Sequence, residues 1–559
     1  MQRPMGTSLE LDPPARPPDA PMVWNGWGDP TRRRGLRARD VRALERLLGG
    51  PLPFTPPVEL EKVALPAARL DEAALARLAA IVGDANVRTG RLPRVAHAAG
   101  RSYTDLVRLR RGDATTAPDA VVLPADHRET AAVLAVCADE GIAVVPFGGG
   151  TSVVGGVTPQ ERARPVVSLD LSRTAGLLDL DGASGLATFG AGTRGVDAEQ
   201  RLAAEGLTLG HLPQSVEHAT LGGFVATRSV GQASTGYGRI DDMVRAVRLA
   251  SPAGEVRAGH PPASGAGPDL LRLLVGSEGT LGVITEVTVR VRPAPARRAF
   301  AGWWLPDFAA GQAALRSLAR ERAAPDVARL SDEAETRLAL AQQSPSARGY
   351  VRARARARGG CLLVAGWDGD HADLVRRRLR ARRALRRVGG RALGAAPGRA
   401  WADQRFEGPY QRDDLLDRGV LVETLETAAA WSALPNVYAA VRAALTRAFA
   451  QQRTRAHVMT HISHLYETGA SLYVTVLARA EPGAEVGQWT AAKDAATRAL
   501  LDAGGTVTHH HGVGALHRAW LGEEVGPLAV DALRAAKRAL DPAGICNPGV
   551  LLPDDDASA

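Results

Sequence analysis

A glycine-rich loop directly after an apolar run is the feature that most restricts the fold of this chain. The apolar residues 142–145 are typical of a buried strand, and Pro146-Phe147-Gly148-Gly149-Gly150-Thr151-Ser152 follows them. Glycines accept positive φ and allow close approach to the backbone, while Thr151 and Ser152 add hydroxyl donors. The spacing predicts a strand ending in a loop whose N–H groups bind phosphate. For this motif alone, a tight turn without a ligand is the alternative.

Length and charge limit the class of protein. With 559 residues the chain is too long for one hydrophobic core, so several units are expected. The net charge of +9 suits nucleic acid, an anionic membrane surface or an anionic substrate equally. Cys137, Cys361 and Cys546 lack CxxC spacing, which argues against a disulfide framework or zinc knuckle and fits a reducing compartment. Without a run of about 18 apolar residues, we expect a soluble protein that is neither secreted nor membrane-spanning.

Hydrophobic periodicity predicts two kinds of unit. Between residues 118 and 296 the pattern is that of an α/β unit, with strands at 121–123, 142–145 and 166–171 and a helix at 129–140. Residues 281–291 alternate apolar and polar, and Pro293 and Pro295 then predict a boundary near 297. The second unit is predicted to be α+β, with strands at 300–305, 361–366 and 471–477 and helices at 371–388, 431–450 and 489–503.

Two arginine-rich stretches, at 352–358 and 376–387, invite a nucleic-acid interpretation. The second is interrupted by apolar residues at helical spacing, which favours a helix with one buried face and one solvated basic face. Neither stretch contains the aromatic residues that stacking on single strands requires. We therefore expect no nucleic-acid partner, while reversible contact with an anionic membrane surface stays open.

The sequence Gly190-Ala191-Gly192-Thr193-Arg194-Gly195 fits the GxGxxG fingerprint of dinucleotide-binding proteins. It follows a strand-like segment and precedes a predicted helix at 196–205. However, Gly210-His211-Leu212-Pro213 stands where a ribose-binding acid is due, about 20 residues on. We interpret this motif as a strand-turn-helix corner and not as a nicotinamide site.

More glycine-rich segments follow, at 213–229, 234–238 and 276–285, and they exceed what turns require. The chain resembles the FAD-binding vanillyl-alcohol oxidase and p-cresol methylhydroxylase (PCMH) superfamily, and within it the alkyldihydroxyacetonephosphate synthases. The superfamily motifs are PFGGGTS, SVEHATLGGFVATR and GSEGTLGVIT. The synthase branch is indicated by WNGWG near the start, YETGA at Tyr466 and HHHGVG from His509.

The resemblance implies an α+β fold with a two-subdomain PCMH-type FAD-binding domain, an α+β cap domain with an antiparallel sheet, and a C-terminal helical segment. Composition and the resemblance together predict the domain boundaries. They are a disordered arm at 1–21, a helical region and start of the FAD domain at 22–117, the FAD-binding domain at 118–296, the cap or substrate domain at 297–505, a segment completing the active site at 506–553 and a disordered tail at 554–559.

The resemblance also implies FAD, bound without a covalent link. Residues 146–152 would hold its pyrophosphate, 214–220 and 227–230 would line the dinucleotide and flavin, and 278–284 would bind the adenosine end. For Glu278, which could accept hydrogen bonds from ribose or adenine, a structural role as a cap is the alternative. The cofactor-binding residues expected in this way are Pro146, Phe147, Gly148, Gly149, Gly150, Thr151, Ser152, Gln214, Ser215, Val216, Glu217, His218, Ala219, Thr220, Thr227, Arg228, Ser229, Val230, Glu278, Gly279, Thr280, Leu281, Gly282, Val283 and Ile284.

Tyr466 is the expected acid/base, a role that comes from the resemblance. Nearby imidazolium or guanidinium groups would lower the pKa of its phenol from about 10, and a structural hydrogen bond is the alternative. The triplet His509, His510 and His511 is the other catalytic candidate. Because neighbouring side chains on a strand alternate, one or two rings would face the site. A metal centre completed by residues such as His461 and His464 is the alternative, and we expect none.

Arg329 and Arg412 match family positions, as a second active-site arginine and as the arginine on the substrate phosphate. A planar guanidinium can donate two parallel hydrogen bonds to phosphate, and a surface ion pair between Arg412 and Asp413 is the alternative. Synthases of this kind carry an arginine shortly before the tyrosine, where this chain has His461 and His464. These two histidines are therefore candidate substrate-binding residues that could alter head-group recognition.

The activity implied is exchange of the acyl group of acyl-dihydroxyacetonephosphate for a long-chain alcohol, through a covalent adduct at flavin N5 and without net redox. The alternative is an FAD-dependent dehydrogenase or oxidase of D-2-hydroxy acids such as D-lactate, glycolate or D-2-hydroxyglutarate. A small-molecule lipid or 2-hydroxy acid substrate, a homodimer and a cytoplasmic location, with peripheral contact at the inner membrane face left open, complete the expectation. A basic binding protein without flavin is supported only by charge.

Overall fold

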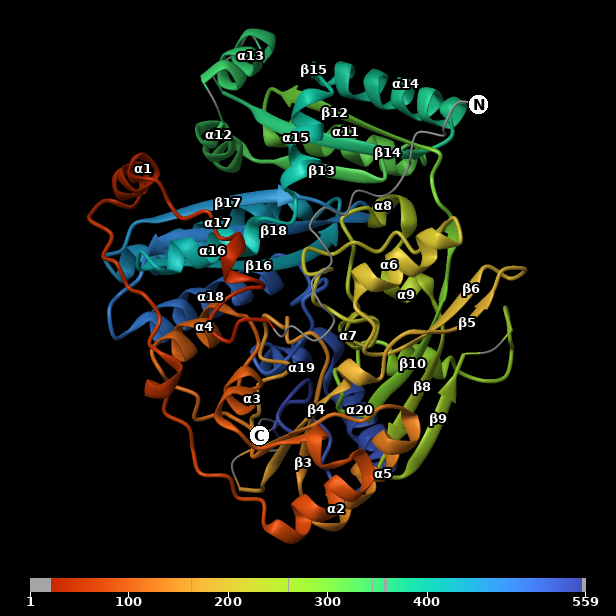
Figure 1. The fold of residues 1–559 in the computed structure, drawn as a ribbon. Coiled ribbons are helices and arrows are strands. Elements are labelled where there is room, and N and C mark those ends of the chain that lie inside the picture. The colour runs from red at the N-terminus through yellow and green to blue at the C-terminus, as the bar shows by residue number, and fades with distance from the viewer. Residues whose placement is uncertain (1–21, 162, 260, 344, 356–358, 555–559) are drawn as a thin grey trace, which may run out of the picture.

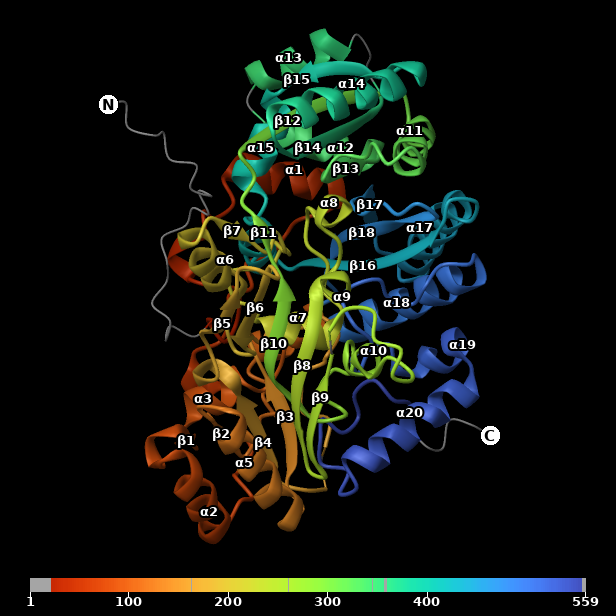
Figure 2. The ribbon, with the colours of Figure 1, turned by 90° about the vertical axis from the view of Figure 1, so that its right-hand side faces the viewer.

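The computed structural model describes residues 22–554 except 162, 260, 344 and 356–358. The predicted arm at 1–21 and residues 555–559 of the predicted tail lie outside the described residues. Figures 1 and 2 show two sheets in the lower part of the molecule, which is the lower lobe, and one larger sheet in the upper part, which is the upper lobe, with helices around them. Residues 207–208 and 292–293 pair as a further, two-stranded sheet. This arrangement is the predicted α+β class.

The first sheet leads into the glycine-rich loop. Its order is β1-β2-β4-β3, in which β2 and β3 run parallel to β4 and β1 is antiparallel to β2. A helix joins β2 to β3, so the parallel strands share their carboxyl ends and the loop emerges from that edge. The bounds are β1 (Val87–Arg88), β2 (Ala120–Val122), α5 (His127–Asp139), β3 (Ala143–Phe147) and β4 (Val166–Asp170).

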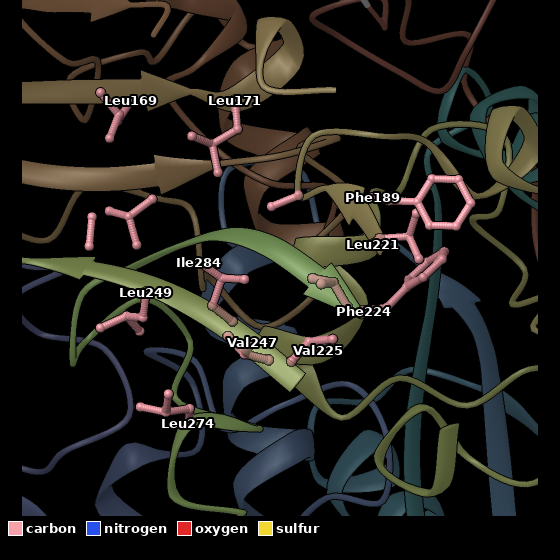
Figure 3. Close-up of a cluster of buried hydrophobic side chains, with 14 of the residues drawn as sticks. Leu169, Leu171, Phe189, Leu221, Phe224, Val225, Val247, Leu249, Leu274 and Ile284 are labelled. Carbon is pink, nitrogen blue, oxygen red and sulfur yellow. The ribbon is translucent and has the colours of Figure 1, made fainter. Parts of the chain in front are cut away.

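The second sheet is antiparallel throughout, with the order β5-β6-β10-β8-β9. Its strands are β5 (Leu177–Asp181), β6 (Leu186–Gly190), β8 (Val244–Ser251), β9 (Gly254–Ala258) and β10 (Val283–Arg290). One hydrophobic cluster joins it to the first sheet, as Figure 3 shows for Leu169, Phe189, Phe224 and Ile284. The two sheets therefore form one core that fixes the glycine-rich loops relative to each other.

The GxGxxG motif forms the expected strand-turn-helix corner between β6 and α6 (Gly195–Ala204). Because β6 belongs to an antiparallel sheet, this corner lacks the parallel crossover of a dinucleotide-binding fold. A β-carbon at Gly192 would overlap the carbonyl of Leu171, so this glycine is required by packing within the protein.

The third sheet has seven strands in the order β15-β12-β14-β13-β17-β18-β16, and every neighbouring pair is antiparallel. Its strands are β12 (Arg297–Leu305), β13 (Val327–Ser331), β14 (Cys361–Gly369), β15 (Arg391–Gly394), β16 (Val420–Ala430), β17 (Ala456–Ile462) and β18 (Gly469–Arg479). A second large hydrophobic cluster packs this sheet against α11 (Phe308–Arg320), α17 (Leu434–Gln451) and α18 (Glu485–Asp502).

The remaining elements surround these sheets. They are α1 (Ala38–Leu48), α2 (Glu72–Val82), α3 (Arg91–Ala96), α4 (Tyr103–Arg110), β7 (Leu207–Thr208), α7 (Leu221–Thr227), α8 (Ser234–Tyr237), α9 (Ile240–Met243), α10 (Leu270–Leu274), β11 (Arg292–Pro293), α12 (Glu333–Gln342), α13 (Pro345–Ala355), α14 (His371–Arg387), α15 (Ala396–Gln404), α16 (Gly408–Leu416), α19 (Leu521–Val525) and α20 (Pro527–Leu540), with short 3-10 turns at Pro30–Arg32, Leu60–Lys62, Asp84–Asn86, Leu171–Arg173 and Arg518–Trp520.

Local sequence explains where several helices begin. Asp126, Asp307, Asp332 and Asp370 each accept a hydrogen bond from the backbone N–H three residues on, which caps α5, α11, α12 and α14. Helix α17 begins at Leu434, later than predicted, with Pro435 in its first turn. Within the described ranges, every helix is too short or too polar to cross a bilayer.

Candidate active site

The loop after β3 presents an unused row of backbone donors. Among the described residues, nothing accepts a hydrogen bond from the N–H groups of residues 148–152. Gly150 has a φ of +64°, which turns the chain back at this point. Successive free N–H groups in a glycine-rich turn form a concave site for an anion. The loop therefore fits the diphosphate that the sequence predicts.

Two other predicted cofactor segments pack directly against this loop. A β-carbon at Gly149 would overlap the carbonyl oxygen of His218, and one at Gly148 would overlap the hydroxyl of Thr220. A β-carbon at Gly279 would lie 2.8 Å from Pro146 Cγ. The structure thus brings together the segments 146–152, 214–220 and 278–284, and glycines allow the close approach.

Some predicted cofactor residues are engaged elsewhere. Both oxygens of Glu278 accept backbone hydrogen bonds, from Val513 at 2.7 Å and Gly514 at 2.8 Å, which favours its structural alternative. Burial raises the pKa of this carboxyl to about 7. Glu217 accepts two hydrogen bonds of 3.0 Å from Arg32, so it fastens the N-terminal segment.

The remaining predicted cofactor residues lie around α7. Thr220 caps this helix by accepting from Gly223 N, and Arg228, which has a φ of +55°, ends it. The guanidinium of Arg228 donates to Asp241 at 3.1 Å, and Ser229 contacts a ring nitrogen of His211 at the same distance. Helix α7 lies directly against the glycine loop through Thr220, whose hydroxyl would overlap a β-carbon at Gly148.

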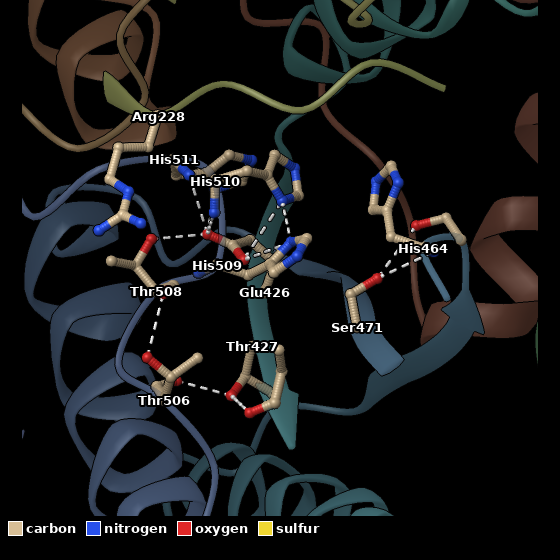
Figure 4. A network of polar contacts seen from close by, with 12 residues as sticks. Arg228, Glu426, Thr427, His464, Ser471, Thr506, Thr508, His509, His510 and His511 are labelled. Carbon is tan, nitrogen blue, oxygen red and sulfur yellow. Dashed lines mark hydrogen bonds and ion pairs between the residues drawn. The ribbon is translucent and has the colours of Figure 1, made fainter. Parts of the chain in front are cut away.

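The histidine triplet is fixed by a buried glutamate, Glu426, that the sequence pattern did not indicate. Glu426 Oε1 accepts from the backbone of His510 at 3.1 Å and His511 at 3.0 Å, and from the hydroxyl of Thr508 at 2.7 Å. Its Oε2 accepts from the backbone of His509 at 2.7 Å (Figure 4). Although burial opposes ionisation, the facing imidazoles hold the pKa of Glu426 well below its usual range. Three consecutive histidines are therefore held by one carboxylate on β16.

Tyr466 lies in hydrogen-bonding distance of this triplet. Its hydroxyl is 2.5 Å from His509 Nε2, and His509 Nδ1 is 2.9 Å from His510 Nδ1. The expected lowering of the tyrosine pKa is wrong, because burial raises it to about 12 and outweighs the opposing guanidinium of Arg239. Burial also places the pKa of His509 well below 6.5. At neutral pH the phenol is therefore protonated and faces a neutral imidazole that can accept its proton.

His461 and Arg329 form a second group on β17 and β13. Arg329 donates to His461 Nε2 at 3.1 Å and to Glu335 at 2.6 Å, and His461 Nδ1 lies 3.1 Å from the same carboxylate oxygen. Burial and the neighbouring Arg329 lower the pKa of His461. Tyr473 stacks on His461 with ring centroids 4.9 Å apart and reaches His510 at 6.0 Å. The two groups therefore meet through Tyr473.

His464 completes the cluster from the turn between β17 and β18. Its Nδ1 lies 2.8 Å from Ser234 Oγ, and its ring centroid lies 5.4 Å from that of His509 and 5.5 Å from that of His510. Burial holds the pKa of His464 well below 6.5. The structure thus assembles five of the predicted imidazoles, Tyr466 and Arg329 around one site.

Arg412, on α16, has unused donors. Its Nη1 donates to the carbonyl of Arg101 at 2.7 Å, while Nε and Nη2 are buried without a hydrogen-bond partner among the described residues. The alternative ion pair with Asp413 is present, with Arg412 Nε 3.9 Å from the carboxylate, but it is buried and not at the surface, because Asp413 is only 1% exposed. Arg101 N donates to Ser152 O at 2.6 Å, so Arg412 lies beside the glycine loop.

A metal centre was the alternative for the histidines. Glu426, His509 and His510 offer ligand atoms within 4.8 Å of one another. The carboxylate of Glu426, however, already accepts from three backbone N–H groups and one hydroxyl, which accounts for its burial without an ion.

The fold and these sites define a class of flavoprotein. Residues 118–259 match the family profile described as FAD binding domain, and residues 294–551 match FAD linked oxidases, C-terminal domain. A solved p-cresol methylhydroxylase shares the fold, with a TM-score of 0.66 and 16% identity over 88% of this chain and 99% of that one. The chain is therefore an FAD-dependent enzyme with the predicted PCMH-type architecture.

Individual relatives place the chain in one family within this class of flavoproteins. An alkyldihydroxyacetonephosphate synthase of Trypanosoma brucei brucei is 31% identical over 95% of this chain and 92% of that protein. A solved structure of an alkyldihydroxyacetonephosphate synthase has a TM-score of 0.82 at 29% identity, covering 94% of this chain and 98% of that one. A glycolate oxidase subunit of Bacillus subtilis is more distant, with 24% identity over 78% of this chain and 90% of that protein. The chain belongs to the alkyldihydroxyacetonephosphate synthase family, and its cofactor is FAD.

Proposed function

We propose that this enzyme exchanges the acyl group of acyl-dihydroxyacetonephosphate for a long-chain alcohol and so forms an ether lipid. The observation that carries the proposal is the hydrogen-bonded pair Tyr466–His509, in which Glu426 holds the backbone of His509. Family membership and the unpartnered donors of Arg412 beside that loop support it.

The free N–H groups of residues 148–152 would hold the diphosphate of FAD, and the segments 214–220 and 227–230 would lie along the rest of it. When bound, oxidised flavin supplies an electrophilic ring that can accept electron density from the substrate. Non-covalent binding is part of the proposal. It is tested by acid precipitation, which should release the yellow colour into the supernatant.

Tyr466 and His509 would move the proton at C1 of the acyl substrate. Because His509 is neutral and 2.5 Å away, it can take the phenolic proton as the phenol oxygen accepts the proton from C1. The imidazolium formed in this way lies next to the Glu426 carboxylate, whose Oε2 is 4.0 Å from His509 Nδ1. Reversal of the same transfers would return the proton after the alcohol has replaced the acid.

Arg412 would bind the substrate phosphate. Its Nε and Nη2 groups point the same way on a planar guanidinium and can donate to two phosphate oxygens. Arg329 would act on charge near the flavin, since Glu335 and His461 fix its position. His464 would face the substrate from the β17–β18 turn, where its stacking on His509 gives it a fixed place.

We also propose where the domains begin, how the chain assembles and where in the cell it works. A cap domain beginning at Arg297 is supported by the start of β12, and an FAD domain beginning near 118 by the start of the family match. A homodimer in the cytoplasm with reversible contact at an anionic membrane is proposed, and the net charge of +9 supports only the last point.

The deciding experiment mixes FAD-loaded protein without oxygen with each substrate class. Acyl-dihydroxyacetonephosphate and radiolabelled hexadecanol should give labelled ether and free fatty acid in equal amounts, while D-lactate and D-2-hydroxyglutarate leave the flavin oxidised. Rapid bleaching by a 2-hydroxy acid, with no ether formed, would replace the proposal with a dehydrogenase of the kind that the glycolate oxidase relative represents.

A further inference from the structure

A basic groove lies in the upper lobe, among residues that the proposed function does not use. It has a volume of about 910 Å³, within the range typical of small-molecule sites, and is lined by residues of α14, β12, β14 and β15 and by residue 353 of α13. Figures 1 and 2 both place α13, α14 and β15 at the opposite end of the molecule from β3, which leads into the glycine loop. The groove is therefore separate from the candidate active site.

One side of the groove carries four arginines that have no counterion in the described part of the chain. Arg378, Arg382 and Arg386 follow one another at four-residue intervals along α14, and Arg391 faces them from β15. Among the described residues, none of these four guanidinium groups forms an ion pair or a hydrogen bond, and no acidic residue lines the groove. On the same helix, the neighbouring Arg377 is instead paired, with Asp326 at 2.8 Å. The free guanidinium groups fit a phosphate.

The other side of the groove is apolar and contains a buried donor. Trp303 and Trp367 form its floor and are only 5% and 2% exposed. Val375 and Leu379, one turn apart on α14, are exposed at its rim. The indole N–H of Trp367 has no hydrogen-bond partner among the described residues, although buried donors are normally satisfied. An acceptor on a bound molecule would satisfy it.

We propose that this groove binds one molecule of a single-chain lipid phosphate. Such a ligand matches both kinds of lining residue, since its phosphate can bind Arg378, Arg382 and Arg391 while its chain buries the exposed side chains of Val375 and Leu379. The recessed position of Trp367 favours a lipid monomer over a membrane surface, because a flat bilayer does not reach a donor buried to this extent. The ligand class follows from these residues alone and does not depend on the proposed function.

The test uses FAD-loaded protein and 1-oleoyl lysophosphatidic acid below its critical micelle concentration, in equilibrium dialysis. The double variant Arg378→Ala/Arg382→Ala should bind one equivalent fewer than the wild type, or bind it at least tenfold more weakly. Its control is Arg380→Ala/Arg383→Ala, which removes the same charge from exposed positions of α14 outside the groove lining and should bind as the wild type does. Trp367→Phe, which keeps an aromatic side chain but removes the N–H donor, should bind several-fold more weakly.

Hydrogen–deuterium exchange distinguishes lipid binding in this groove from lipid binding at the active site. The lipid should protect residues 371–395 in the wild type, and should still do so in Arg412→Ala, in which any binding at the active site is impaired. Failure of the proposed function would therefore leave this protection unchanged. Equal losses in the two double variants, equal binding of a neutral monoacylglycerol, or binding to phosphatidic acid vesicles but not to the monomer would each overturn the proposal.

Discussion

Replacing Glu426 by glutamine tests whether the histidine triplet depends on a buried negative charge. Glutamine has nearly the same shape, but only one of its two terminal atoms accepts hydrogen bonds. Oε1 of Glu426 accepts from three donors, so the new carbonyl should take that place and turn the amide N–H₂ toward the backbone N–H of His509. Two donors then face each other in a buried site.

The expected losses of stability and of rate in Glu426→Gln follow from these contacts. Leaving one buried donor unsatisfied costs about 1–3 kcal/mol of folding free energy. Loss of the charge that stabilises the imidazolium of His509 should raise the barrier by about 3 kcal/mol, which is roughly a hundredfold decrease in kcat. Because the folded-state pKa of Glu426 is depressed, its contribution to stability is present above pH 4.5 and lost as the pH falls further. Glu426→Gln should lose that part of the acid sensitivity.

Glu423→Gln is the matched control. Glu423 lies on the same strand, is also buried, and accepts from the backbone of Tyr103 and Thr424, yet it binds no atom of the histidine triplet. Urea unfolding and the incorporation of radiolabelled hexadecanol are measured for both variants. We expect similar losses of stability, but a hundredfold loss of ether formation in Glu426→Gln alone. Equal rates in the two variants would refute the assignment of Glu426 as a positioning residue.

Three further changes probe other parts of the site. Tyr466→Phe should keep its flavin spectrum and lose at least a thousandfold in ether formation, and full activity would remove the phenol from the mechanism. Gly149→Ala should lose FAD and stability, because its β-carbon overlaps the carbonyl of His218, whereas Gly487→Ala, in open space on α18, should retain both. For Glu278, whose folded-state pKa is raised to about 7, stability is complete below pH 4.5 and falls by up to about 3 kcal/mol as the pH rises through 7. Glu278→Gln should flatten this pH dependence in urea titrations, and an unchanged slope would contradict the raised pKa.

Local sequence was sufficient to identify the glycine loop and the three longest helices, α14, α17 and α18. A strand followed by three glycines has few conformations available, and the long amphipathic helices α14 and α18 follow from periodicity alone. The strands β16 and β17 were not identified, because Glu423, Glu426 and His461 interrupt the apolar pattern that marks a buried strand. A glutamate within an apolar strand segment was the signal that could have identified Glu426, since a buried carboxylate needs partners.

The pKa of Tyr466 shows that the burial of a site residue could not be predicted from the sequence. Its neighbours were correctly expected to be imidazole and guanidinium groups, but the sign of the shift depends on burial, which outweighs them. Glu278 is a similar case, because its motif suggested a ligand contact while its carboxylate binds the backbone of Val513 and Gly514. In both cases the chemistry of the residue was visible in the sequence, whereas its partners come from segments far away along the chain.

The segment after α18 is held by carboxylates from both lobes. Glu426, on the third sheet, binds the backbone of residues 509–511, and Glu278, next to the glycine loop, binds that of residues 513 and 514. Ala515 N also donates to Val154 O at 3.0 Å, directly after the glycine loop. The imidazoles are thus fixed relative to both the predicted flavin site and the sheet that carries Arg329. A rigid-body shift between the lobes would break one carboxylate contact or the other, so the proton-transfer geometry depends on both lobes keeping their relative position.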